Sequence, residues 1–297
     1  MRSVMRILLA LILVLPVGAV AAEDDRLTIH TVNYPLQYFA QRIAGEHAEV
    51  VFPAPVDGDP AFWQPSAEDI AAYQQADLIL LNGAGYAKWV QRVALPRRKL
   101  VDTSAGFRDR YIQVDGTVTH SHGSGGDHSH AGTAFTTWLD PTLAVEQARA
   151  VGQALVRLRP GQANYFDDNL KALEKDLLAL DGRLQEIVAA DPGQRFLASH
   201  PVYQYLQRRY GLHLQSLMWE PGQDPGNAEW AALAGRLTER PAHWMIWEGE
   251  PMQATVERLK TMGVQSLVFE PAANRPQKGD FLGVMARNLD NLRAAFQ

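Results

Sequence analysis

The sequence contains no cysteine in 297 residues. Disulfide bonds and thiolate metal sites are therefore excluded, and any metal ion must be held by imidazole, carboxylate, carbonyl or water ligands. The chain also lacks an excess of positive charge, since its formal net charge is −5 at pH 7. Binding to nucleic acid or to an anionic membrane surface is disfavoured, because both require a basic face.

Long apolar runs are absent except at the amino terminus, where one extends from Ile7 to Val20. Arg2 and Arg6 precede this run, and small residues followed by Glu23 come after it. A bilayer span needs about 20 apolar residues, so the run is short for a membrane helix. The pattern is typical of a secretory signal peptide over residues 1–22, with an uncleaved anchor as the alternative. Its removal would change the formal charge from −5 to −7, and we expect an exported chain without a membrane span.

Histidine is concentrated in one stretch: four of the nine histidines are His120, His122, His128 and His130. The residues between them are Ser, Gly and Asp, so no apolar period predicts a helix or a buried strand. Neutral imidazole is the commonest protein ligand for zinc, and histidine-rich tracts indicate metal binding. We therefore predict a flexible metal-binding loop over residues 120–130. A polar loop without a role is the alternative.

The rest of the chain alternates between segments of strand and helix character. The predicted strands are 27–32, 49–52, 77–81, 99–101, 195–199, 214–218, 243–247 and 266–269. The predicted helices include 36–43, 67–76, 86–93, 142–158, 203–210, 227–239, 255–262 and 281–296, and Ser66 with Asp69 forms a capping-box pattern. This alternation predicts an α/β fold with mostly parallel sheets.

A different pattern separates the two halves. From Phe166 to Ile187 the apolar residues recur at alternating steps of four and three, which predicts one long helix. Pro160 precedes this helix and Asp191-Pro192-Gly193 ends it. We therefore expect two Rossmann-like lobes, 23–158 and 191–297, joined by a rigid connecting helix over 159–190.

Polar residues follow three predicted strands of the second lobe. His200, the pair Glu248 and Glu250, and Glu270 each stand directly after a strand. Ligands of open α/β sheets bind outside the carboxyl ends of the strands, so these residues are expected to converge. The Glu220–Asn227 segment could line the mouth of the same cleft, or could simply be the loop before a helix.

Several motifs occur in a characteristic order. They are Asn33-Tyr34-Pro35-Leu36, Gly58-Asp59-Pro60 followed by Ser66 and Asp69, Trp138-Leu139-Asp140-Pro141, Ser199-His200-Pro201 and Asn288–Leu292. In order and spacing they resemble the metal-specific solute-binding proteins of ABC transporters, most closely the zinc type, over nearly the whole mature chain. The resemblance implies a monomeric, non-enzymatic periplasmic protein. It binds Zn2+, with Mn2+ as the second possibility, and its partner is an ABC permease of the inner membrane.

Two of the family's metal ligands are replaced in this sequence. The resemblance places Ala61 and Thr136 where the first lobe usually supplies ligands, whereas His200 matches the third ligand. Glu270 stands where the family usually has aspartate, and Glu248 or Glu250 lies near another position where some members carry a carboxylate. We hypothesise that one or two of the histidines at 120, 122, 128 and 130 complete the shell, because His130 is six residues before Thr136.

A zinc chaperone or buffer without a transport role is the main alternative to zinc delivery, because two ligands are missing. A metallohydrolase using His200, Glu248 and Glu270 is disfavoured, because the sequence has neither an HExxH motif nor a serine nucleophile elbow. Nothing in the sequence distinguishes an adhesin-like role.

Overall fold

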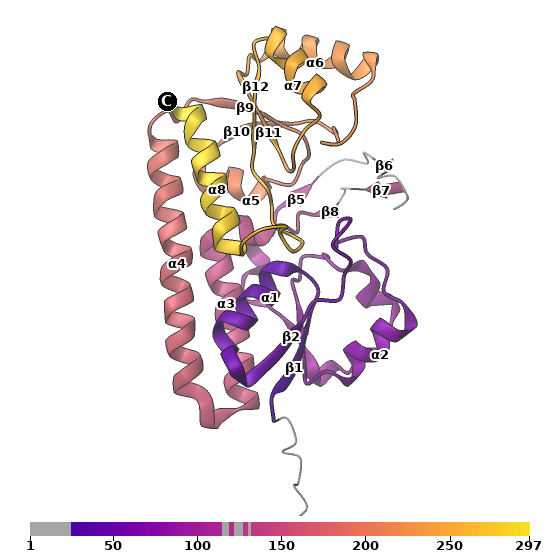
Figure 1. The fold of residues 1–297 in the computed structure, drawn as a ribbon, viewed down its shortest axis with the longest axis vertical. Helices are drawn as coiled ribbons and strands as arrows, with labels where there is room; N and C mark the ends of the chain where they lie inside the picture. The colour runs from indigo at the N-terminus through magenta and orange to yellow at the C-terminus, as the bar shows by residue number, and fades with distance from the viewer. Residues whose placement is uncertain (1–24, 115–118, 122–126, 130–131) are drawn as a thin grey trace, which may run out of the picture.

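A computed structural model describes residues 25–114, 119–121, 127–129 and 132–297 (Figure 1). The predicted signal peptide lies outside the described residues. Within these ranges, no helix combines the length and apolar character needed to cross a bilayer.

The first lobe is built on a four-stranded sheet in the order β2-β1-β3-β4, and all neighbours are parallel. Its strands are β1 (Leu27–Thr31), β2 (Ala48–Val51), β3 (Leu78–Leu81) and β4 (Leu100–Asp102). Its α-helices are α1 (Tyr34–Ala44), α2 (Ala67–Gln75) and α3 (Pro141–Leu158). The predicted capping box of α2 is confirmed, because Ser66 and Asp69 exchange side-chain and backbone hydrogen bonds.

The prediction of a helix over residues 86–93 is wrong in the type and the length of the helix. The structure has a short 3₁₀-helix, η2 (Lys88–Arg92), between Ala87 and Val93, which are both outside helical conformation. Only five residues remain helical, and a segment this short cannot sustain an α-helical ladder of hydrogen bonds.

The second lobe repeats the architecture with the strand order β10-β9-β11-β12, again entirely parallel. Its strands are β9 (Arg195–Ala198), β10 (His213–Ser216), β11 (Trp244–Trp247) and β12 (Gln265–Val268). Its helices are α5 (Gln204–Tyr210), α6 (Asn227–Glu239), α7 (Gln253–Thr261) and α8 (Phe281–Arg293). The prediction of two α/β lobes with parallel sheets is confirmed.

One long helix lies beside both lobes. Helix α4 (Ala163–Ala189) has 27 residues and packs against α3 and α8 (Figure 1). A single apolar core contains residues from both lobes and from α4, for example Phe39, Phe166, Leu184 and Phe196. The lobes therefore share a core, which restricts their relative movement.

The histidine-rich tract is described only in part, so the predicted flexible loop over 120–130 stays a prediction. The described residues in and around it form two short antiparallel ladders: β5 (Gln113–Val114) pairs with β8 (Gly132–Thr133), and β6 (Thr119–Ser121) pairs with β7 (Asp127–Ser129). His120 lies opposite His128 in the second ladder. Backbone pairing needs only N–H and C=O groups, so it does not require the apolar pattern on which the sequence prediction depended.

Candidate metal site

His200 is the buried centre of a polar cluster at the carboxyl edge of the second sheet. Its side chain is 1% exposed, and its Nε2 and Nδ1 atoms lie 3.1 Å and 3.0 Å from carboxylate oxygens of Glu220 and Glu248. One potential ligand atom from each residue lies within 4.8 Å of the other two. Among the described residues, this is the one group of three or more such side chains with the spacing of a metal site.

Backbone pairing brings the three residues together. The N–H of Ser199 donates to Ile246 O at 2.8 Å, and the N–H of Trp219 donates to Ser199 O at 2.9 Å. These bonds extend the alignment of β9 with β11 and with the segment after β10. Each of the three chain segments therefore presents its next polar side chain at the same edge, as expected for parallel strands.

The cluster combines one imidazole with two carboxylates, so its positive and negative charges do not balance. Burial alone lowers the pKa of His200, but the carboxylates of Glu220 and Glu248 outweigh burial and raise its pKa to about 10. In the ion-free chain the imidazole is therefore protonated at neutral pH and lies between two anions. A divalent cation can replace this proton, because it brings more positive charge to the same two carboxylates.

The donor set suits a transition-metal ion. One imidazole nitrogen and two carboxylate oxygens are three ligands, and zinc sites with three protein ligands leave a fourth position for water. Oxygen ligands also suit manganese, whereas the imidazole favours zinc. The residues present therefore fit the ion that the sequence predicts.

Glu248 was predicted as a ligand and lies in the cluster, whereas Glu270 lies outside it. The backbone of Glu270 is held by Asn288, which accepts from its N–H at 2.9 Å and donates to its carbonyl at 2.7 Å. Burial raises the pKa of the Glu270 carboxyl, and the nearby Arg287 partly offsets this effect. Both nitrogens of His200 meet other carboxylates, so a ligand role for Glu270 stays a prediction.

The four tract histidines are only partly described. The structure gives the backbone of His120 and His128, whereas His122 and His130 lie outside the described residues. At the base of the tract, the Tyr205 hydroxyl donates to Ala134 O at 3.0 Å. Since α5 begins four residues after His200, the base is tied to the segment that carries this histidine. Coordination by the tract stays a prediction.

The two first-lobe positions where the resemblance expects ligands are used for packing. Ala61 is 2% exposed and belongs to the apolar core. Thr136 is 4% exposed, and its hydroxyl donates to Val202 O at 2.5 Å. A methyl group cannot bind a metal ion, and the threonine hydroxyl already has an acceptor.

Glu220 is the cluster residue that the sequence predictions omitted. The sequence places it only in a loop that could line the cleft. Its position directly after the extended segment 214–219 is equivalent to the positions of His200 and Glu248 after their own strands. That equivalence is the sequence signal by which it could have been found.

The chain has two α/β lobes with parallel sheets, one long helix that joins them, and polar residues at the strand ends. This combination defines the class of solute-binding proteins whose two lobes are connected by a helix. A sequence model of the family described as "Zinc-uptake complex component A periplasmic" matches residues 29–295, and the chain therefore belongs to the ZnuA family.

Relatives with curated descriptions share about a quarter of the sequence. The high-affinity zinc uptake system protein ZnuA of Bacillus subtilis (strain 168) is 25% identical over 293 residues, covering 93% of this chain and 89% of that protein. The zinc-binding lipoprotein AdcA of Streptococcus pneumoniae (TIGR4) is 26% identical over 282 residues. That match covers 91% of this chain and 56% of AdcA, so the chain spans little more than half of that relative's length.

Solved structures confirm the fold. The metal-dependent lipoprotein YcdH of Bacillus subtilis superposes with a TM-score of 0.77 at 22% identity, covering 91% of this chain and 98% of that one. The solute-binding protein FpvC of Pseudomonas aeruginosa, in complex with Mn2+, gives a TM-score of 0.73 at 23% identity, with 92% and 99% covered.

Proposed function

We propose that this protein binds a zinc ion through His200, Glu220 and Glu248 in the periplasm and delivers it to an ABC importer. The observation that carries the proposal is the preassembled group of one imidazole and two carboxylates, in a chain that belongs to the ZnuA family. The B. subtilis relative is named as part of a high-affinity zinc uptake system, which supports the transport role. No covalent bond is made or broken in this function; only coordination bonds to the ion form and break.

The proposed coordination uses three protein ligands. Neutral His200 supplies one nitrogen, and each glutamate supplies one oxygen. The fourth position is taken by water, by Glu270 or by a tract imidazole. Two carboxylates balance the double charge of the ion, so the bound site is neutral except for the fourth ligand.

Zinc titration of single variants tests the site. We expect His200→Ala, Glu220→Gln and Glu248→Gln each to weaken zinc binding at least about tenfold, equivalent to about 1.4 kcal/mol, in calorimetric titrations. Glu250→Gln is the matched control, because Glu250 is exposed and lies outside the cluster. Equal affinity of wild type and His200→Ala would reject the proposed site.

A zinc buffer without a transport role is the second candidate, favoured by the absence of ligand atoms at Ala61 and by the engaged hydroxyl of Thr136. Uptake of radioactive zinc by a deletion strain separates the two functions. Reduced uptake at low external zinc, restored by the wild-type gene but not by the His200→Ala gene, supports delivery. Normal uptake with altered zinc tolerance supports buffering.

A further inference from the structure

We propose that Thr136 of the first lobe is a positioning residue for the metal ligand His200, through the hydrogen bond that its hydroxyl donates to Val202. This inference rests on the proposed function, because it takes His200 as a ligand of the ion. It gives the first lobe a part in ion binding at a position where the family resemblance expects a coordinating side chain.

His200 lies in the connection between β9 and α5. On its amino-terminal side the sheet holds the backbone, because Ser199 pairs with Ile246 and with Trp219. On its carboxyl-terminal side, residues 200–203 lie in bends and turns and not in a strand or helix. The carbonyls of these four residues therefore need donors from outside the regular ladders, since a buried carbonyl without a partner is costly.

Hydrogen bonds within the second lobe satisfy three of these four carbonyls. They are His200 O with Val202 N at 2.9 Å, Pro201 O with the Gln204 side chain, and Tyr203 O with Gln207 N at 2.7 Å. The fourth, Val202 O, accepts from the Thr136 hydroxyl of the first lobe at 2.5 Å. Because the Val202 N–H donates to His200 O, both belong to one tight turn, and a shift of Val202 also shifts the backbone of His200.

Thr136 is itself held in place. Its side chain is 4% exposed. The amide of Asn82 donates to Phe135 O at 2.9 Å, and the N–H of Leu139 donates to Thr136 O at 3.1 Å, where the short 3₁₀-helix η6 (Thr137–Leu139) follows. The hydroxyl is therefore a fixed donor, as a residue that positions a ligand must be.

Tyr205 makes a second bond across the same boundary. Its hydroxyl donates to Ala134 O at 3.0 Å and accepts from the N–H of Ile112 at 3.3 Å. The Tyr205 side chain is 0% exposed, so water does not compete for these bonds. Thr136 and Tyr205 thus form a clamp in which each lobe donates one hydroxyl to a carbonyl of the other.

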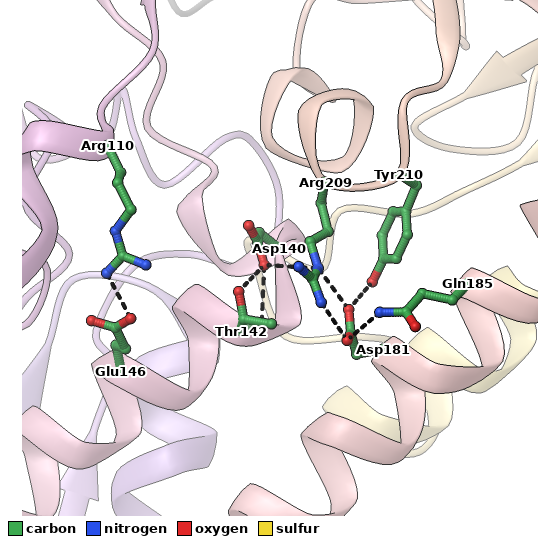
Figure 2. A network of polar contacts seen from close by, with 8 residues as sticks. All are labelled: Arg110, Asp140, Thr142, Glu146, Asp181, Gln185, Arg209 and Tyr210. Carbon is green, nitrogen blue, oxygen red and sulfur yellow. Dashed lines mark hydrogen bonds and ion pairs between the residues drawn. The ribbon is translucent and has the colours of Figure 1, made fainter.

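A charged network holds the far end of α5 (Figure 2). Arg209 donates to both oxygens of Asp181 in α4 at 2.9 Å and 2.6 Å, and the Tyr210 hydroxyl donates to Asp181 at 2.8 Å. Arg209 also lies 3.9 Å from Asp140, the residue that caps the first turn of α3. This network joins the second lobe, the connecting helix and the first lobe. It fixes the end of α5, whereas the Thr136 hydroxyl acts two residues from His200.

The position of the His200 backbone matters because its ring lies between two carboxylates, 3.1 Å from Glu220 and 3.0 Å from Glu248. A coordinating group must stay within about 0.5 Å of its productive geometry. Without the Thr136 hydroxyl, Val202 O has to find another donor, and the turn that includes His200 moves with it. Zinc affinity should then fall although every coordinating atom is still present.

Variants at two adjacent threonines test this role. Thr136→Val removes the hydroxyl and keeps the shape of the side chain, whereas Thr136→Ser keeps the hydroxyl. Thr137→Val is the matched control, because Thr137 is 0% exposed and its hydroxyl donates to Gln147 Oε1 at 3.0 Å within the first lobe. Calorimetric titration measures the zinc affinity of each ion-free protein, and urea unfolding measures its stability.

We expect Thr136→Val to weaken zinc binding at least about fivefold, just below the range for groups that bond a ligand directly. Thr136→Ser and Thr137→Val should stay within about twofold of the wild-type affinity, because they keep the hydrogen bond to Val202. Both valine variants lose a buried hydrogen bond, so both should be less stable than wild type. The difference in zinc affinity therefore separates positioning of His200 from general destabilisation.

Wild-type affinity of Thr136→Val overturns the inference, and so does equal weakening by Thr137→Val or a failure of Thr136→Ser to keep the affinity. Tyr205→Phe tests the other half of the clamp and serves if Thr136→Val does not fold. It should weaken zinc binding at least about twofold, and unchanged affinity overturns the inference as well. Failure of the proposed function is seen separately, as unchanged affinity of His200→Ala.

Discussion

Replacing Arg209 by methionine should destabilise the ion-free protein by about 3 kcal/mol, because it leaves a buried carboxylate without its cationic partner. Asp181 is 6% exposed and accepts two hydrogen bonds from Arg209. Loss of one partner of a buried ion pair typically costs roughly 3–5 kcal/mol. We take the lower value, because Arg209 is itself 31% exposed and Asp181 keeps its bonds from Tyr210 and Gln185.

Urea unfolding measures this loss, and the melting temperature should fall by roughly 6–12 °C for a chain of this size. Arg183→Met is the matched control, since Arg183 lies on the same helix as Asp181 and forms a surface pair with Asp290, with side chains 39% and 65% exposed. The control should lose less than about 1 kcal/mol. If both variants lose the same free energy, the buried network does not stabilise the junction as we argue.

A double variant separates the pair from its surroundings. Asp181→Leu combined with Arg209→Met removes both charges, so it should be more stable than Arg209→Met alone. If the double variant is less stable than either single variant, the cost comes from lost packing and not from an unpaired charge.

Three further predictions concern protonation and coordination. Because the pKa of His200 is raised to about 10, zinc binding near pH 8 should release about one proton. Calorimetry in buffers of different ionisation enthalpy measures the number of protons released. Zinc binding without proton release would contradict a protonated His200 in the ion-free site. Burial lowers the pKa of His30, and Glu49 only partly offsets this effect. The contribution of His30 to stability should therefore be present above about pH 6.5 and lost as the pH falls through the lowered pKa of His30 in the folded protein. His30→Phe should therefore reduce the acid-side decline of stability in urea titrations at several pH values, and an unchanged decline would argue against it. Replacing all four tract histidines by alanine should weaken zinc binding if they complete the shell, and unchanged calorimetric affinity would reject coordination by the tract.

The sequence by itself determined the helices that are marked by local patterns, such as a capping box or a regular recurrence of apolar residues. The capping box of Ser66 and Asp69 predicted the start of α2, and the recurrence of apolar residues from Phe166 to Ile187 predicted α4. Helix capping and periodicity act over a few residues, so they can be read without knowledge of the fold. The same holds for the placement of His200 and Glu248 after strands, which follows from the alternation of β and α segments.

Only the tertiary structure decided which of these residues meet. Glu220 joins His200 because Trp219 pairs with Ser199 across the sheet edge, and no spacing along the chain encodes that bond. The 3₁₀-helix η2 and the pairing of His120 with His128 likewise depend on backbone contacts that leave no side-chain period. Contacts between distant segments depend on strand register and lobe packing, and these are properties of the whole fold.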